Sequence, residues 1–128
     1  MARKKKYSDN ERIASNIYSA IKQRTSNIRW ERENFIKWYI NETKQCYYCG
    51  CGEEEINKFY NSDKSKRKKR GKRLEIERIN PNEDYEEKNC KLSCYWCNNA
   101  KSDTFTEHEF KSIGLEIGCI IRNRIKSE

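Results

Sequence analysis

Apolar residues recur at helical spacing in two segments near the N-terminus. The first follows a capping-box pattern at Ser8 and Glu11, and its isoleucines recur at every fourth position, which predicts a helix over residues 9–24. The second places three aromatic side chains at positions i, i+3 and i+4, which predicts a helix over residues 31–43. We expect these aromatic side chains to pack in a core rather than to stack on nucleobases.

The pattern then changes to the alternation that is typical of strands. The stretch "RLEIERI" predicts a strand over residues 73–79, and "CKLSC" predicts a second strand over residues 90–94. A helix is expected to begin within "WCNNAKSD". A further capping-box pattern at Thr106 starts another helix, for which Gly114 is the expected stop. The residues from 115 onward are apolar and then basic, which fits a last strand or helix. These elements together predict an α+β fold.

Composition suggests that this core needs reinforcement. Of the 128 residues, 34% are hydrophobic and 38% are charged, so a covalent or metal staple is expected. The formal net charge of +8 favours a polyanionic partner, most often a nucleic acid. The N-terminal stretch does not resemble a signal peptide, and no apolar run approaches the length of a membrane span. We therefore expect a cytoplasmic protein whose thiols stay reduced.

Seven cysteines supply a candidate staple. Two Cys-x-x-Cys pairs are separated by residues 50–93, and two pairs with the same internal spacing predict one tetrahedral, structural zinc site, formed by Cys46, Cys49, Cys94 and Cys97. The alternative is four ordinary buried thiols. Cys51 and Cys90 lie close enough in the chain to compete as ligands, whereas Cys119 has no evident role.

A strongly basic stretch, "NSDKSKRKKRGKR", precedes the first predicted strand. It cannot bury apolar area, so it is expected to form a loop or a loose hairpin tip, either as a solvated connector or as a surface that contacts phosphates. The residues predicted to bind nucleic acid here are Lys66, Arg67, Lys68, Lys69, Arg70, Lys72 and Arg73.

The order of these motifs resembles that of the HNH endonuclease family. The resemblance lies in a "CYYCG" knuckle, a strand "LEIER" that carries an acidic residue, a loop with tyrosine and asparagine, and "CYWCNNAKSD". It extends over about residues 44–114 and implies a zinc-stapled ββα-metal core with an N-terminal helical segment. The domain organisation that we expect is a basic tail over 1–7, a helical segment over 8–44, the HNH domain over 45–114 and a C-terminal extension over 115–128.

The resemblance also implies functional residues. Glu77 and Asn98 occupy the positions that hold a catalytic Mg²⁺ or Mn²⁺ ion, and Asn89 matches the asparagine that orients the catalytic strand. Lys101 follows Asn98 on the same helical face and is predicted to contact nucleic acid. The implied activity is hydrolysis of DNA phosphodiester bonds, in a bacterial cell or in one infected by a phage.

Two positions depart from the family pattern. Arg78 stands where the family usually has the histidine that acts as general base, and Glu77 stands where aspartate is commonest. Arginine stays protonated and cannot act as that base, but it can bind the scissile phosphate. The remaining candidates for the base are a metal-bound water, Tyr47 or Tyr48, and His108, the single histidine. In addition, a regular strand would direct Glu77 and Arg78 to opposite faces unless it ends or bulges there.

Three readings of the sequence therefore stay open. The first is a metal-dependent HNH endonuclease, for which a homodimer would supply the two active sites needed to cut both strands of DNA. The second is a zinc-stapled DNA-binding module that has lost catalysis, for which Arg78 is the main argument. The third is RNA binding through the aromatic and basic residues, which fits the composition but does not explain the arrangement of Glu77, Asn89 and Asn98.

Overall fold

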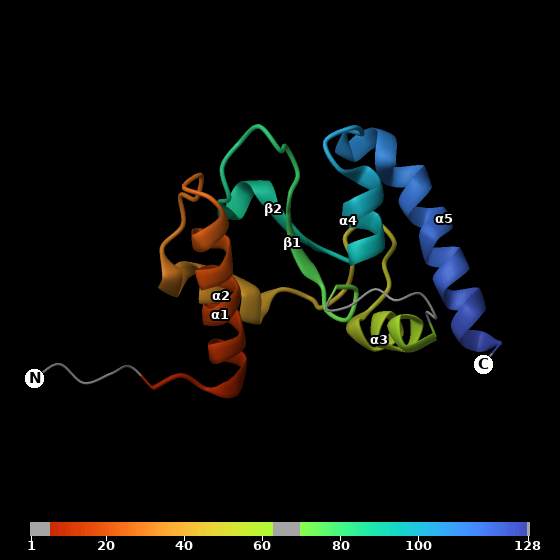
Figure 1. Ribbon diagram of the computed structural model, residues 1–128, viewed down its shortest axis with the longest axis horizontal. Coiled ribbons are helices and arrows are strands. Elements are labelled where there is room, and N and C mark those ends of the chain that lie inside the picture. Colours follow the sequence, from red (N-terminus) through yellow and green to blue (C-terminus); the bar gives the residue numbers. More distant parts are fainter. Residues whose placement is uncertain (1–5, 63–69, 128) are drawn as a thin grey trace, which may run out of the picture. The chain divides into compact units, whose positions relative to one another are not determined.

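The computed structural model describes residues 6–62 and 70–127 of the chain. Its contacts divide the chain into two compact units (Figure 1): Met1–Glu42 with Glu83–Asn89, and Thr43–Asn82 with Cys90–Glu128. Among the described residues, no helix combines the length and apolar character that a membrane span requires.

The first unit is helical. Helix α1 (Asp9–Arg24) begins with a complete capping box in which Ser8 accepts from the amide of Glu11, so the helix predicted over residues 9–24 is confirmed. Helix α2 (Arg32–Asn41) lies inside the range predicted for it. A short 3₁₀ turn, η1 (Glu87–Asn89), ends the loop that returns to this unit.

Aromatic side chains form the core of the first unit. Phe35 is fully buried, and its ring lies edge-on to that of Trp30, with 5.0 Å between ring centroids. The Tyr18 hydroxyl donates to the backbone oxygen of Trp30 at 2.6 Å. The loop is tied to this core by backbone hydrogen bonds that Tyr85 makes with Asn27 and Arg29. Of the three aromatic residues predicted to pack in a core, Phe35 and Tyr39 are buried, and Trp38 is half-buried with its ring centroid 5.0 Å from that of Trp30.

The described residues of the second unit form two strands and three helices. Strand β1 (Glu75–Arg78) pairs antiparallel with β2 (Cys90–Ser93), and α4 (Tyr95–Lys101) follows β2 after a single residue (Figure 1). Both strands lie inside the predicted ranges, and α4 begins at Tyr95, one residue before the stretch in which its start was predicted. Helices α3 (Glu53–Ser62) and α5 (Glu107–Lys126) complete the unit and pack against each other. The α+β fold class is confirmed.

Helix α3 has no counterpart among the predicted elements. Its first turn carries three glutamates, which favour the positive end of the helix dipole, and it buries Ile56 and Phe59 at a spacing of one turn. The helix extends to Ser62, so the first two residues of the predicted basic loop are helical.

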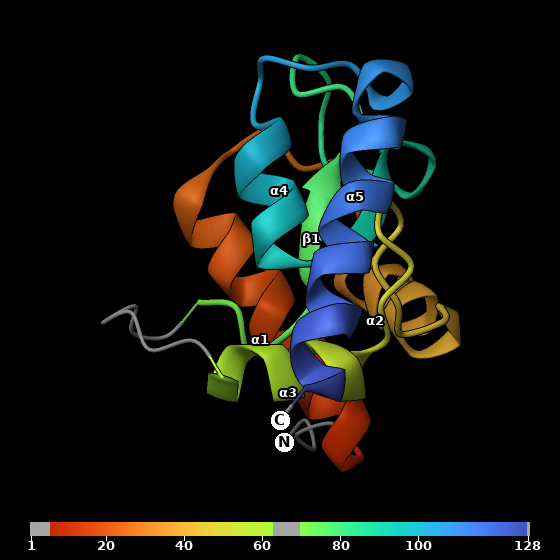
Figure 2. The same cartoon turned by 90° about the vertical axis from the view of Figure 1, so that its right-hand side faces the viewer.

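The prediction that Gly114 stops a helix is wrong, because α5 continues without interruption to Lys126. Gly114 instead lets the helix approach the first cysteine knuckle: a Cβ built at this position would lie 2.8 Å from the Cβ of Tyr48. Gly118, one turn later, would place a Cβ 2.6 Å from the backbone oxygen of Cys49. In Figure 2, α5 runs alongside α4, which it also contacts. The residues from 115 onward therefore form the second half of α5.

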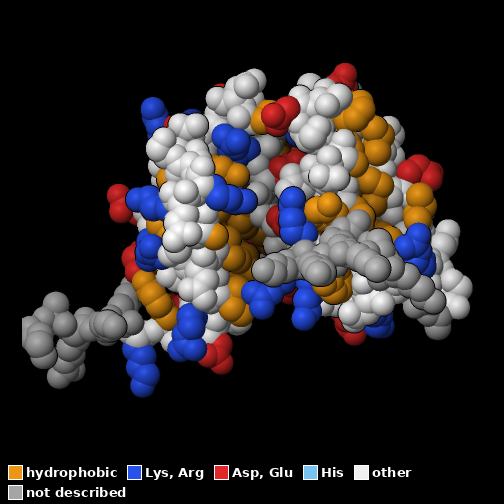
Figure 3. Space-filling model, in the orientation of Figure 1, with side chains coloured by type: hydrophobic (Ala, Val, Ile, Leu, Met, Phe, Trp, Pro, Cys, Tyr) orange, Lys and Arg blue, Asp and Glu red, His pale blue; other side chains and the backbone are white. Residues whose placement is uncertain are grey.

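Helix α5 exposes several apolar side chains. Leu115 and Ile120 are 61% and 52% exposed, and Figure 3 shows hydrophobic surface over this helix.

Candidate metal centre and active site

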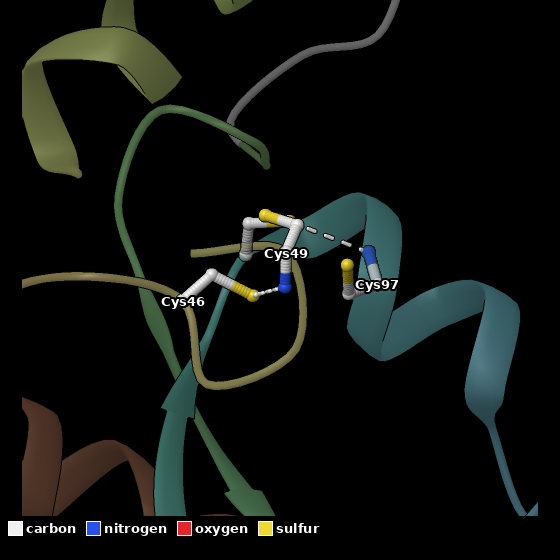
Figure 4. A group of neighbouring side chains, drawn as sticks. Cys46, Cys49 and Cys97 are labelled. Atoms are coloured by element: carbon white, nitrogen blue, oxygen red, sulfur yellow. Dashed lines mark hydrogen bonds between the residues drawn. The ribbon is translucent and has the colours of Figure 1, made fainter. Parts of the chain in front are cut away.

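The four cysteines of the two Cys-x-x-Cys pairs come together in the second unit. All four are buried, and their sulfur atoms lie within 4.8 Å of one another. Each pair has the same local geometry. The Cys49 amide donates to the Cys46 sulfur at 3.5 Å (Figure 4). The Cys97 amide donates to the Cys94 sulfur at 3.4 Å. The predicted ligand set is thus positioned for a zinc site.

The chemistry of these thiols also fits a metal ion. Contacts with the neighbouring thiols, Cys46 first, lower the pKa of Cys49, whereas Cys46 and Cys49 raise the pKa of Cys94 and Cys97. Ionisation of Cys46 and Cys49 therefore opposes ionisation of Cys94 and Cys97, and a bound cation allows all four to be thiolates. Cys51 is buried outside this group of four.

Backbone contacts fix the first knuckle against the sheet. The Tyr47 amide donates to the Leu92 oxygen of β2 at 2.9 Å, and the Gly50 amide donates to the Cys46 oxygen at 2.9 Å. Gly50 has a φ of 76°, a left-handed conformation that glycine adopts without a Cβ clash. Because Cys94 caps α4, the same cysteine cluster fixes the start of that helix.

Glu77 lies on β1 and is 5% exposed. Its Oε1 atom is 3.6 Å from the Lys101 Nζ atom, which also donates to the Ile79 backbone oxygen at 3.4 Å. Burial raises the pKa of Glu77, while the nearby Tyr48 hydroxyl and Lys101 oppose this increase. Within the described residues, neither Glu77 Oε2 nor the Tyr48 hydroxyl makes a hydrogen bond of normal geometry, although the two side chains lie close enough to affect each other's pKa. A buried carboxylate oxygen without a partner fits a ligand for a hard cation such as Mg²⁺ or Mn²⁺.

Asn98 lies on α4, as predicted, but its direct partner is Glu75 rather than Glu77. The Asn98 Nδ2 atom donates to Glu75 Oε1 at 2.9 Å. The Arg70 guanidinium donates two hydrogen bonds to the same carboxylate, with Nε 3.0 Å from Oε2 and Nη2 2.7 Å from Oε1. Glu75 is not among the site residues predicted from the sequence. Its spacing of two residues from Glu77 could have indicated it, since both side chains then share one face of the strand.

Arg78 and Asn89 take different positions. Arg78 is the last residue of β1 and pairs with Cys90 in a register without a bulge. The alternation of a regular strand directs it away from the face of Glu77, although the strand ends at this residue. Asn89 belongs to the first unit, where it is buried and its Nδ2 atom donates to the Asp84 oxygen at 3.0 Å.

The candidate general bases differ in their surroundings. His108 is exposed in the first turn of α5. The exposed Tyr47 donates a hydrogen bond from its hydroxyl to Glu107, which raises the pKa of the tyrosine. Burial, with a further contribution from Glu77, raises the pKa of Tyr48.

The residues predicted to bind nucleic acid are also in different settings. Lys66, Arg67, Lys68 and Lys69 lie outside the described residues. Lys72 and Arg73 are exposed just before β1, and Arg70 is exposed but engaged with Glu75. Lys101 is 1% exposed and is directed to Glu77. Its predicted contact with nucleic acid stays a prediction.

An antiparallel strand pair that leads directly into a helix, with a four-cysteine cluster at the junction, is the arrangement of a zinc-stapled ββα core. A comparison with solved structures supports this class. The chain is similar to PacI, a rare-cutting HNH restriction endonuclease, with a TM-score of 0.68 and 25% sequence identity over 97% of this chain and 87% of that one. No protein-family model and no curated protein matches the chain. The fold is therefore that of an HNH endonuclease, as the sequence motifs suggested.

Proposed function

We propose that this protein is a metal-dependent HNH endonuclease that hydrolyses phosphodiester bonds in DNA. The observation that carries the proposal is the buried Glu77 carboxylate, whose Oε2 atom has no partner in the described part of the chain, beside a helix fixed by the cysteine cluster. The similarity to PacI supports the same conclusion.

In this proposal, Glu77 and Asn98 hold a Mg²⁺ or Mn²⁺ ion, and the cysteine cluster holds a structural zinc ion. The divalent ion would neutralise charge on the scissile phosphate and make a bound water more acidic. Arg78 would bind the phosphate through its guanidinium, and Asn89 would order the loop before β2. The exposed Lys72 and Arg73, with the basic residues before them, would contact phosphates along the DNA.

A specific observation favours the alternative, a DNA-binding module without catalysis. The Lys101 ammonium already lies 3.6 Å from Glu77 Oε1, so it supplies the positive charge that a divalent ion would otherwise bring. Arg78, which stands in place of a general base, also favours a DNA-binding module without catalysis. The two functions differ in one measurable respect, which is whether bound DNA is cut.

The test is a nicking assay on supercoiled plasmid with zinc-loaded protein in Mg²⁺ or Mn²⁺. We expect nicking by the wild type, and a loss of at least about 100-fold in Glu77→Ala and Asn98→Ala, since each removes a proposed metal ligand. Glu54→Gln, which removes an exposed carboxylate from α3, is the matched control and should cut normally. DNA binding without nicking in either metal would favour the module instead.

Two further properties belong to the proposal. Binding to non-specific DNA should weaken with salt: the logarithm of the binding constant should fall against the logarithm of the salt concentration with a slope of about 0.9 for each phosphate that is neutralised.

Cutting of both strands would require two active sites, so we also propose a homodimer, which analytical ultracentrifugation with and without DNA would measure. A protein that stays monomeric on DNA and only nicks it would contradict the dimer but not the nuclease.

A further inference from the structure

Asn98 can hold a cation only through its Oδ1 atom, because the Nδ2 atom carries hydrogens and has no lone pair for a metal. The side-chain amide can rotate by half a turn, so the sequence alone leaves either atom facing the site. An interaction that fixes the amide in one orientation would therefore matter for any metal that Asn98 holds.

Glu75 provides such an interaction. A carboxylate accepts hydrogen bonds and has no hydrogen to donate, so the amide group facing it must be the NH₂ group. The 2.9 Å bond from Asn98 Nδ2 to Glu75 Oε1 satisfies this requirement and directs Oδ1 away from Glu75. The carboxylate itself is held in place by the two charge-assisted bonds from Arg70, whose guanidinium also stacks 4.6 Å from the Tyr95 ring centroid.

We propose that Glu75 is a positioning residue that fixes the Asn98 amide with Oδ1 available to a divalent cation, and that Arg70 holds Glu75 in place for this purpose. The inference rests on the proposed role of Asn98 as a metal ligand. In this proposal Glu75 acts through Asn98 and does not itself hold the ion; its Oε1 atom already accepts hydrogen bonds from both Asn98 and Arg70.

The decisive variant is Glu75→Gln, which keeps the size of the side chain. Glutamine can either accept from or donate to the Asn98 amide, so both amide orientations become possible. We expect the affinity of zinc-loaded protein for Mn²⁺, measured by calorimetry without DNA, to fall by about 10- to 100-fold, the usual effect of losing a partner that orients a ligand. Glu54→Gln again serves as the matched control.

A double-mutant cycle separates positioning from direct binding. If Glu75 acts through Asn98, Glu75→Gln should change Mn²⁺ affinity by no more than about threefold in an Asn98→Ala background. The proposal would be overturned if Glu75→Gln lowered Mn²⁺ affinity equally in the wild-type and Asn98→Ala backgrounds, or if it did not lower the affinity in the wild-type background. Nuclear magnetic resonance gives an independent readout: the Asn98 side-chain NH₂ signals, identified by their absence in Asn98→Ala, should shift markedly in Glu75→Gln. Unchanged signals would contradict the hydrogen bond on which the inference depends.

These outcomes are distinct from a failure of the proposed function. If the wild type bound Mn²⁺ and showed the expected cycle but did not nick DNA, the nuclease proposal would fail and the positioning role would stand. If Asn98→Ala left Mn²⁺ affinity unchanged while the wild type still nicked DNA, the positioning role would fail and the nuclease proposal would survive with a different ligand set.

Discussion

Gly118 offers the sharpest test of how α5 packs on the first cysteine knuckle. The residue is buried, and a Cβ at this position would lie 2.6 Å from the backbone oxygen of Cys49 and 3.3 Å from its Cβ. Real Cβ atoms essentially never approach another heavy atom to less than 3.0 Å. Because the contacted atom belongs to the backbone of a knuckle that is held on both sides, Gly118→Ala must displace either the knuckle or the helix.

The sign of the effect distinguishes this packing from ordinary helix behaviour. In an exposed helix interior, replacing glycine by alanine stabilises by about 1 kcal/mol. Overpacking a close contact costs about 1–3 kcal/mol, and a clash with backbone should lie at the upper end of that range. The difference is a net loss of about 2 kcal/mol in the free energy of unfolding for Gly118→Ala.

Urea unfolding of zinc-loaded protein, followed by circular dichroism, measures this difference. Ser112→Ala, at an exposed position of the same helix, is the matched control and should be stabilised by a few tenths of a kcal/mol, about what helix propensity alone gives. We also expect Gly118→Ala to lose zinc to a chelator faster than the wild type, because Cys49 is displaced. A Gly118→Ala protein as stable as the wild type, or more stable, would refute the close approach.

Two further predictions concern the metal cluster and the buried charge pair. Chelation, or Cys94→Ser, should unfold the second unit, because a structural zinc ion contributes about 10–16 kcal/mol of apparent folding energy; Cys119→Ser, at an exposed thiol, should keep one zinc per chain by metal analysis. Lys101→Met should destabilise zinc-loaded protein by about 3–5 kcal/mol in urea unfolding, because it leaves the buried Glu77 carboxylate unpaired. The double variant with Glu77→Gln should recover most of that loss, and an unchanged stability of the single variant would contradict the pairing.

The features that the sequence predicted well are those with local causes. The capping box at Ser8 depends on residues three apart, and each Cys-x-x-Cys pair places two sulfurs on one turn. The alternation of apolar and charged residues that identified β1 is likewise a local feature of the sequence. Helix α3 also has a local signal, three glutamates before Ile56 and Phe59, which the predicted elements do not include.

The features that could not be predicted depend on contacts between distant segments. Glycine serves equally well as a helix stop and as a point of close approach, and only the position of Tyr48 against Gly114 decides between them. The helical spacing of Lys101 from Asn98 correctly placed both on α4. The same spacing could not reveal that Lys101 is buried. That burial accompanies its ion pair with Glu77, which lies on β1, a separate element.

The pairing of α4 with β1 suggests why the cysteine cluster and the acidic face occur together. Asn98 and Lys101, three residues apart on the helix, meet Glu75 and Glu77, two residues apart on the strand. Three helical residues rise about 4.5 Å and two strand residues about 6.7 Å, so the two spacings are similar enough for the side chains to make both contacts in the observed register. Cys94 and Cys97 fix that register, because they anchor the first turn of α4 to the knuckle beside β2. A one-residue slip of the helix would break both contacts, and loss of the metal should therefore loosen them together.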